Sequence, residues 1–206
     1  AKDLLEQVAF EARSSEYVDS KSGVSARMTI SGMENLMAAA KLRLIETGEE
    51  KTSVRLVDFA SIIPSITGKI ELVYEGEQEG ADEVAKVLID QAILTEFEKI
   101  FPRIPKLEKE GVKTPYTDII NWFDNHALEL NYTDNDKDYN DQLFSIAPLV
   151  ALVKEQCADI DEVERAFCME LVLWSLAIND KLDKTISEKV FKYDSKSLSD
   201  HFYGNN

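Results

Sequence analysis

The chain has 206 residues, and 39 acidic against 23 basic side chains give it a formal net charge of −16. Such a charge repels nucleic acid unless the basic residues gather in one patch, and the sequence has no such patch, so we expect no nucleic-acid partner. With 8 glycines and 5 prolines, the chain has fewer of these residues than turn-rich sheets or disordered linkers need, which favours an all-α fold.

The sequence also bears on location. It has no apolar run of about 18 residues and no basic-then-apolar leader, so we expect no membrane partner. Two cysteines, Cys157 and Cys168, are too few and too widely spaced for a disulfide framework or a zinc site. We therefore expect a cytoplasmic protein whose thiols are small buried groups. The chain begins at Ala1 rather than Met, and we expect it to be part of a longer protein.

Helical spacing of apolar residues predicts a first helix over residues 3–12, followed by a polar loop to Gly23. The next helix has the clearest pattern, and Gly48 follows its end, where a left-handed residue is favoured. Its predicted core-facing residues are Met33, Leu36, Met37, Ala40 and Leu44.

A shorter helix is expected from Thr52 or Ser53 to Ile63, stopped by Pro64. Residues 66–80 follow, and residues 69–74 within them are the one plausible strand of the sequence. Because no second strand is evident to pair with it, we interpret this segment as an extended connector packed on helices.

The remainder of the chain is expected to be helical, with a charged linker at residues 102–114 and a polar, acidic loop at 131–141. The last helix is apolar nearly all round, so it should form the centre of a core. Predicted helices lie at residues 84–101, 114–130, 142–157 (with a kink or a start at Pro148) and 159–178. We divide the chain into residues 1–78, a helical subdomain with the extended connector, and residues 79–206, a second helical domain in which 102–114 is a possible linker.

Motifs for catalysis are absent. The only Gly-Lys pair is Gly68-Lys69, which lacks the upstream glycine and the following hydroxyl of a P-loop. His126 and His201 are the only histidines, and an isolated histidine is more often a core or surface residue than a catalytic one. We therefore expect no catalytic residue in this chain alone.

The acidic stretch 134–138 is similar to the start of an EF-hand calcium loop, in which alternate oxygens converge on the ion. Tyr139 stands where that loop needs glycine, however, and Ser145 stands where it needs a bidentate glutamate. A solvated acidic loop is the favoured interpretation, and no metal site is expected.

Arg27 is the best-placed cation of the sequence. It follows Ser22-Gly23-Val24-Ser25-Ala26 at the start of the second helix and lies about 120° from Met33 around the helix axis. A guanidinium there can point a forked donor at a phosphate outside the helices. The alternative is an ion pair within the chain, most simply with Glu34 or Asp19.

Three blocks of the sequence resemble the C-terminal part of bacterial AAA+ ATPases related to the ATPase (I) subunit of magnesium chelatase and to the MoxR-like group. The resemblance covers roughly residues 1–101. The blocks are Glu11-Ala12-Arg13-Ser14-Ser15-Glu16-Tyr17-Val18-Asp19, Ser22-Gly23-Val24-Ser25-Ala26-Arg27 and Ile66-Thr67-Gly68-Lys69-Ile70-Glu71-Leu72-Val73-Tyr74-Glu75-Gly76-Glu77.

This resemblance implies a helical lid in which Arg27 is the sensor-2 arginine that contacts the γ-phosphate of ATP. It gives Arg13 no assigned role. The ATP and Mg²⁺ of the full-length protein would be bound by a P-loop domain upstream of Ala1, so the chain alone should not hydrolyse ATP. The implied partners are that domain, neighbouring subunits of an AAA+ ring and an unknown protein target that is remodelled.

A second hypothesis comes from a different class of protein. The chain could be a non-enzymatic helical module in which residues 106–206 bind a protein partner, since that part carries no recognised motif. The two hypotheses are compatible because they concern different halves of the chain.

Overall fold

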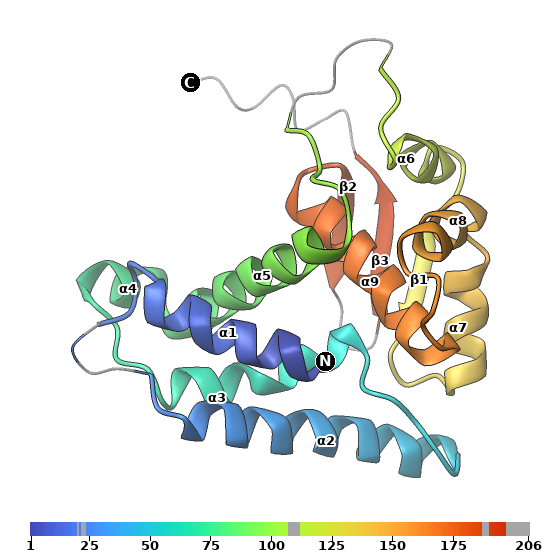
Figure 1. Ribbon diagram of the computed structural model, residues 1–206. Coiled ribbons are helices and arrows are strands. Elements are labelled where there is room, and N and C mark those ends of the chain that lie inside the picture. The colour runs from blue at the N-terminus through green and yellow to red at the C-terminus, as the bar shows by residue number, and fades with distance from the viewer. Residues whose placement is uncertain (20, 22–23, 107–111, 187–189, 197–206) are drawn as a thin grey trace. The chain divides into compact units, whose positions relative to one another are not determined.

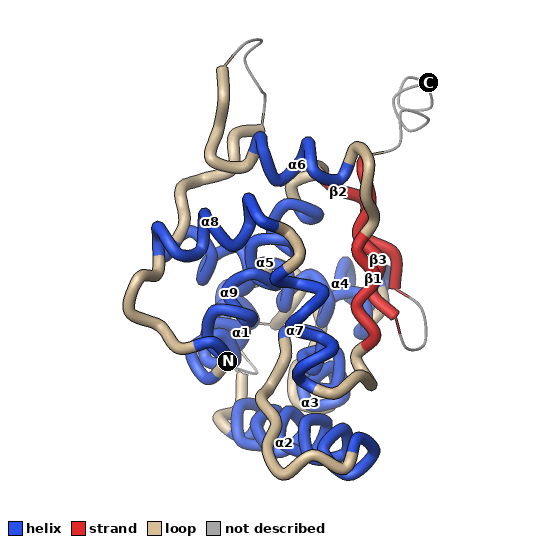
Figure 2. Tube along the Cα trace, turned by 90° about the vertical axis from the view of Figure 1, so that its right-hand side faces the viewer, coloured by secondary structure: helices blue, strands red, loops and turns tan. Residues whose placement is uncertain are grey.

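The computed structural model describes residues 1–206 except 20, 22–23, 107–111, 187–189 and 197–206. Most of the described residues are helical, and a small antiparallel sheet accompanies them (Figures 1 and 2). The chain forms two compact units, Ala1–Ile100 and Phe101–Asn206. Each unit is described separately below.

The first unit is built from helices. Its elements are α1 (Lys2–Ser14), α2 (Arg27–Thr47), the 3-10 helix η1 (Leu56–Ile62), α3 (Ile63–Thr67), α4 (Tyr74–Glu79) and α5 (Ala81–Ile100). Helix α5 packs along α1 and also contacts α3 and α4, while α2 packs on η1, α1 and α3. The predicted division at residues 78/79 therefore falls inside this unit, because α5 buries its apolar side against α1.

Helix α2 ends as predicted, with Gly48 in the left-handed conformation at φ 69°. Its buried side is rotated from the predicted one. Leu36 and Ala40 are buried as expected, whereas Met37 is 48% exposed. The buried residues are Met28, Gly32, Leu36, Ala40 and Arg43. The rotation places an arginine in the core and leaves methionine at the surface.

Pro64 does not stop a helix here. It lies in the first turn of α3, where its missing N–H leaves no intrahelical hydrogen bond unmade. The helix predicted before it is the 3-10 segment η1. The connector that follows is short, because α4 begins at Tyr74.

The second unit combines helices with a sheet. Its elements are α6 (Thr117–Phe123), β1 (Leu128–Asn131), α7 (Asp136–Phe144), α8 (Ala147–Gln156), α9 (Glu162–Ile178), β2 (Leu182–Ile186) and β3 (Val190–Ser195). The strands are antiparallel in the order β1-β3-β2, with Leu130 opposite Phe191 and Lys184 opposite Tyr193. The expectation of an all-α fold is therefore correct for most of the chain but misses this sheet.

The predicted helix over residues 114–130 is one of the differences. Helix α6 ends at Phe123, and the chain then enters β1, whose side chains alternate between buried and exposed. Leu128 and Leu130 point into the core and Glu129 points out. That alternation suits a strand with one covered face better than a helix.

Helix α9 forms the centre of the second unit, as predicted. Every residue from Cys168 to Leu176 is buried, and the helix packs against α7, α8 and β2. Asp161 caps its start by accepting a hydrogen bond from the Glu164 N–H at 2.8 Å. Pro148 marks a helix start, since α8 begins at Ala147.

Candidate functional site

Arg27 is the first residue of α2, and its side chain is exposed. Its backbone is held locally. The Arg27 N–H donates to Ser25 Oγ at 3.2 Å, and Ser31 Oγ donates to the Arg27 carbonyl at 2.9 Å. Within the described part of the chain no group forms an ion pair or hydrogen bond with its guanidinium, so neither Glu34 nor Asp19 pairs with it.

A buried ion pair joins the C-terminal half of α2 to η1. Arg43 is 4% exposed and Asp58 is 7% exposed, and the guanidinium contacts the carboxylate through two hydrogen bonds of 2.8 and 3.1 Å. Arg43 also donates to the Ser53 carbonyl, and Asp58 accepts from the Arg55 N–H at 2.8 Å. This buried, doubly hydrogen-bonded charge pair joins α2, the helix that begins at Arg27, to η1.

Two of the blocks that carry the family resemblance contact each other. The Asp19 N–H donates to the Glu71 carbonyl at 2.8 Å, and the Val73 N–H donates to the Tyr17 carbonyl at 3.1 Å. Val18 and Leu72 form the bridge between them. The candidate strand of the sequence is therefore paired with the loop after α1, for one bridge only.

Gly76 explains how closely these two blocks approach. A Cβ at this position would lie 2.5 Å from the Tyr17 carbonyl oxygen, which is closer than non-bonded atoms can come. Only glycine fits there without moving the backbone. The loop that ends near Arg27 is thus joined to the connector by backbone contacts.

Arg13, which the sequence leaves without a role, lies in the last turn of α1. Its guanidinium carbon lies 5.5 Å from the centre of the Phe10 ring, a cation–π contact at the surface. Arg13 therefore has a contact within its own helix.

The acidic stretch 134–138 does not form a calcium loop. Helix α7 starts within it, and Asn135 caps the helix by accepting from the Asp138 N–H at 2.9 Å. Lys137 pairs with Asp141 at 2.7 Å. Across the described residues, no group of three or more His, Cys, Asp or Glu side chains is placed to hold a metal ion.

His126 lies beyond the end of α6 and stacks on Trp122, with 4.4 Å between the ring centres and 16° between the planes. Its Nδ1 is 2.8 Å from the Trp122 carbonyl oxygen, a contact that requires the proton on Nδ1. The imidazole therefore donates a hydrogen bond to a carbonyl group in the last turn of α6. His201 lies outside the described residues.

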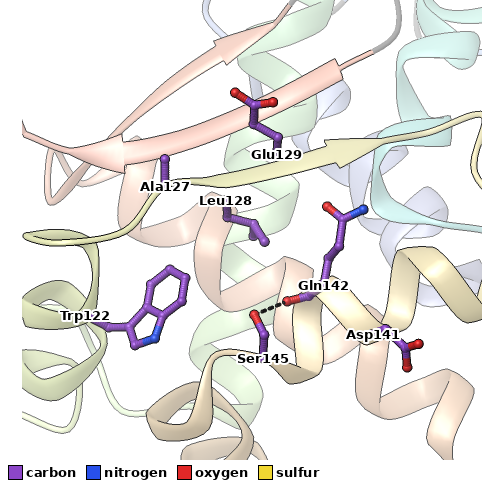
Figure 3. Close-up of a pocket in the computed structure, with 7 residues that line it drawn as sticks. All are labelled: Trp122, Ala127, Leu128, Glu129, Asp141, Gln142 and Ser145. Carbon is purple, nitrogen blue, oxygen red and sulfur yellow. Dashed lines mark hydrogen bonds between the residues drawn. The ribbon is translucent and has the colours of Figure 1, made fainter.

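A pocket of about 540 Å³ opens beside Trp122 in the second unit (Figure 3). Its lining residues include one aromatic, two apolar and two acidic residues, and the two carboxylates point away from Trp122 in Figure 3. The lining residues are Trp122, Ala127, Leu128, Glu129, Asp141, Gln142 and Ser145. The Ser145 hydroxyl donates to the Gln142 carbonyl at 2.6 Å, and the described residues that line the pocket include no histidine or lysine. It therefore has binding groups but no activated nucleophile.

The two cysteines are free thiols, with Cys168 buried and Cys157 half-buried. Burial raises the pKa of Cys168 to about 12 and also raises that of Cys157. Both thiols stay protonated at neutral pH and are poor nucleophiles.

Sequence reasoning did not find the Arg43–Asp58 pair or the pocket beside Trp122. Arg43 lies one turn beyond Ala40 on the buried side of α2, so its spacing is a signal that was available. The pocket has no comparable signal, because α6, β1 and α7 must first be placed in three dimensions.

Comparisons with protein-family models, with curated proteins and with solved structures each found no match. Among the helices that the structure describes, none has the length and apolar character to span a membrane.

Proposed function

We propose that this chain is the C-terminal part of a AAA+ ATPase, in which the first unit is the lid and Arg27 is the sensor-2 residue. The observation that carries this proposal is that the Arg27 side chain is exposed and unpaired among the described residues. A permanently charged guanidinium at the start of a long helix, exposed and without a partner among the described residues, suits a phosphate group from outside the unit.

The backbone contacts between the first and third resemblance blocks support the same proposal. They join the loop after α1 to the connector through Tyr17, Val73 and Gly76. The second block leads directly into Arg27. Blocks that are far apart in the sequence thus belong to one local structure, as expected if they serve one function.

In this proposal ATP and Mg²⁺ are held by a P-loop domain encoded before Ala1, and Arg27 supplies positive charge to the γ-phosphate during hydrolysis. The described residues offer the Arg27 guanidinium for the phosphate, and among them no cluster of three or more His, Cys, Asp or Glu side chains is placed to hold the metal. Movement of the lid with the state of the phosphate would couple hydrolysis to remodelling of a protein target.

The test is ATP hydrolysis by the full-length protein. Replacing Arg27 by Ala should reduce turnover by more than tenfold, because an arginine that contacts the transferred phosphoryl group contributes strongly to its stabilisation. Lys51→Ala is the matched control, since Lys51 is also an exposed cation of the first unit, and it should leave turnover unchanged. Wild-type turnover in Arg27→Ala would contradict the assignment of Arg27.

The pocket beside Trp122 favours a second function for the second unit, the binding of a protein partner. Glu129 and Asp141 are among its lining residues. Asp141 is paired with Lys137, and Glu129 supplies negative charge that suits a lysine or arginine side chain. Glu129→Gln with Asp141→Asn should then weaken capture of a Lys- and Arg-containing peptide, measured by fluorescence anisotropy. Unchanged binding by the double variant would exclude this pocket as the peptide site.

A further inference from the structure

Helix α2 has an outer face that the first unit leaves uncovered. Figure 1 shows α1 and α3 on one side of α2 and no helix of the first unit on the other. Three apolar side chains of this face are strongly exposed: Ile30 by 60%, Met37 by 48% and Ile45 by 76%. Exposed apolar residues gathered on one helix indicate a contact surface more often than scattered ones do.

The start of this face is hollowed. A groove of about 360 Å³ lies between α1 and the first turns of α2. Leu5 of α1 and Ile30, Met33 and Met37 of α2 supply its apolar lining. A projecting apolar side chain from another helix would fit such a groove, and the flexible methionines can adapt to it.

Residues of the same type recur at seven-residue intervals along α2. Apolar residues recur every seventh position at Ile30, Met37 and Leu44, and charged residues recur every seventh position at Arg27, Glu34 and Lys41. Residues seven positions apart lie on nearly the same side of a helix, so each set forms one stripe along α2. The charges alternate in sign along the helix.

Glu34 and Lys41 are exposed, and neither makes an ion pair or hydrogen bond within the described residues. They are two turns apart on the same side of α2, too distant to pair with each other. An antiparallel copy of the helix would change this. When Lys41 of a second copy lies opposite Glu34, Glu34 of that copy lies opposite Lys41, so one alignment forms the ion pair twice.

We propose that the outer face of α2 binds the same face of a second copy of this chain, as an antiparallel two-fold pair of helices. The alignment that pairs Glu34 with Lys41 also places Ile45 of the second copy opposite Ile30, at the groove. Ile45, the most exposed large apolar residue described, thereby becomes covered. The same patch serves both copies, as two-fold symmetry requires.

The pairing is tested at residues other than Arg27. In this alignment Arg27 lies opposite Gly48, at the end of the overlap and outside the two ion pairs. Charge reversals at Glu34 and Lys41 therefore test the pairing, whereas Arg27→Ala tests the nucleotide function proposed above.

The experiment is sedimentation velocity of the 206-residue chain over a series of protein concentrations, with single and double charge reversals. Glu34→Lys alone and Lys41→Glu alone should each weaken dimerisation at least tenfold, because each places like charges opposite one another twice. The double variant Glu34→Lys/Lys41→Glu should restore wild-type dimerisation, since it exchanges the partners of both pairs.

The two single variants change the net charge in opposite directions, so a general charge effect cannot weaken both. Glu46→Lys is the matched control, because Glu46 is exposed on α2 about 120° from Glu34 around the axis, and it should have no effect. A monomer at all concentrations, single reversals without effect, or a double reversal that fails to restore dimerisation would each overturn the proposal.

Discussion

The long helix α2 of the first unit and the helix α9 of the second unit are both rich in apolar residues, but they are used differently. Helix α9 is buried on all sides from Cys168 to Leu176. Helix α2 buries one side through Leu36 and Arg43 and exposes Ile30, Met37 and Ile45. An apolar helix at the centre of a unit is explained by that unit alone, whereas the uncovered side of α2 is the surface on which we propose that a second copy binds.

The comparison implies that α2 depends on a few strong anchors, and removing one should have the largest effect. Asp58→Ala leaves the Arg43 guanidinium buried without its carboxylate, which should cost about 3–5 kcal/mol of stability in the first unit. Hydrogen exchange should become faster in α2 and η1. The double variant Arg43→Met/Asp58→Leu removes both charges and should recover most of the lost stability. If stability is not recovered, the loss in Asp58→Ala does not come mainly from the unpaired charge of Arg43.

The centre of the second unit should respond as a packed core. Leu173 of α9 is fully buried, and Leu173→Ala should lower the free energy of unfolding by about 3 kcal/mol through lost contacts and the cavity left behind. Urea denaturation followed by tryptophan fluorescence measures this directly, because both Trp122 and Trp174 lie in this unit. A change below about 1 kcal/mol would show that α9 is less tightly packed than its burial indicates.

The buried thiol of α9 predicts a smaller effect that depends on pH. The pKa of Cys168 is about 12 in the folded protein, against 9.0 for an unperturbed thiol, so folding favours the protonated form. Stability should be constant below about pH 8 and fall as the pH rises further, by about 1 kcal/mol between pH 9 and 10. The Cys168→Ala variant should lose this part of the pH dependence. An identical pH profile of stability in both proteins would show that Cys168 does not cause it.

The smallest effect is expected on the outer face of α2. Ile45→Ala removes a side chain that is 76% exposed, so the monomer should change in stability by less than about 0.5 kcal/mol. Thermal unfolding at a low protein concentration tests this. A loss comparable to that of Leu173→Ala would mean that Ile45 packs within its own chain, and the contrast between the two helices would disappear.

Much of the helical architecture could be predicted because local signals determine it. Gly48 ends α2, Asp161 starts α9 within its predicted range, and α5 stops before Pro102, as the spacing and caps indicate. Pro148 was also a valid signal, since it begins α8. Each of these features depends on residues within one or two turns of each other.

The sheet could not be predicted in the same way. Strand β1 has four residues, and its partner β3 begins at Val190, so nothing nearby in the sequence reveals the pairing. The rotation of α2 has a similar cause. Its buried side includes Arg43, whose ion pair with Asp58 a pattern of apolar residues does not contain. The exposure of Arg27 was predictable from the helix period, whereas its lack of an ion pair required the structure.

The central claim is that Arg27 contacts the γ-phosphate, and nucleotide binding by the full-length protein tests it most directly. Arg27→Ala should weaken binding of a non-hydrolysable ATP analogue about tenfold, equivalent to about 1.4 kcal/mol, and leave ADP binding unchanged, because ADP has no γ-phosphate. Isothermal titration calorimetry with both nucleotides measures the difference. An equal loss for both nucleotides, or no loss for either, would contradict the claim.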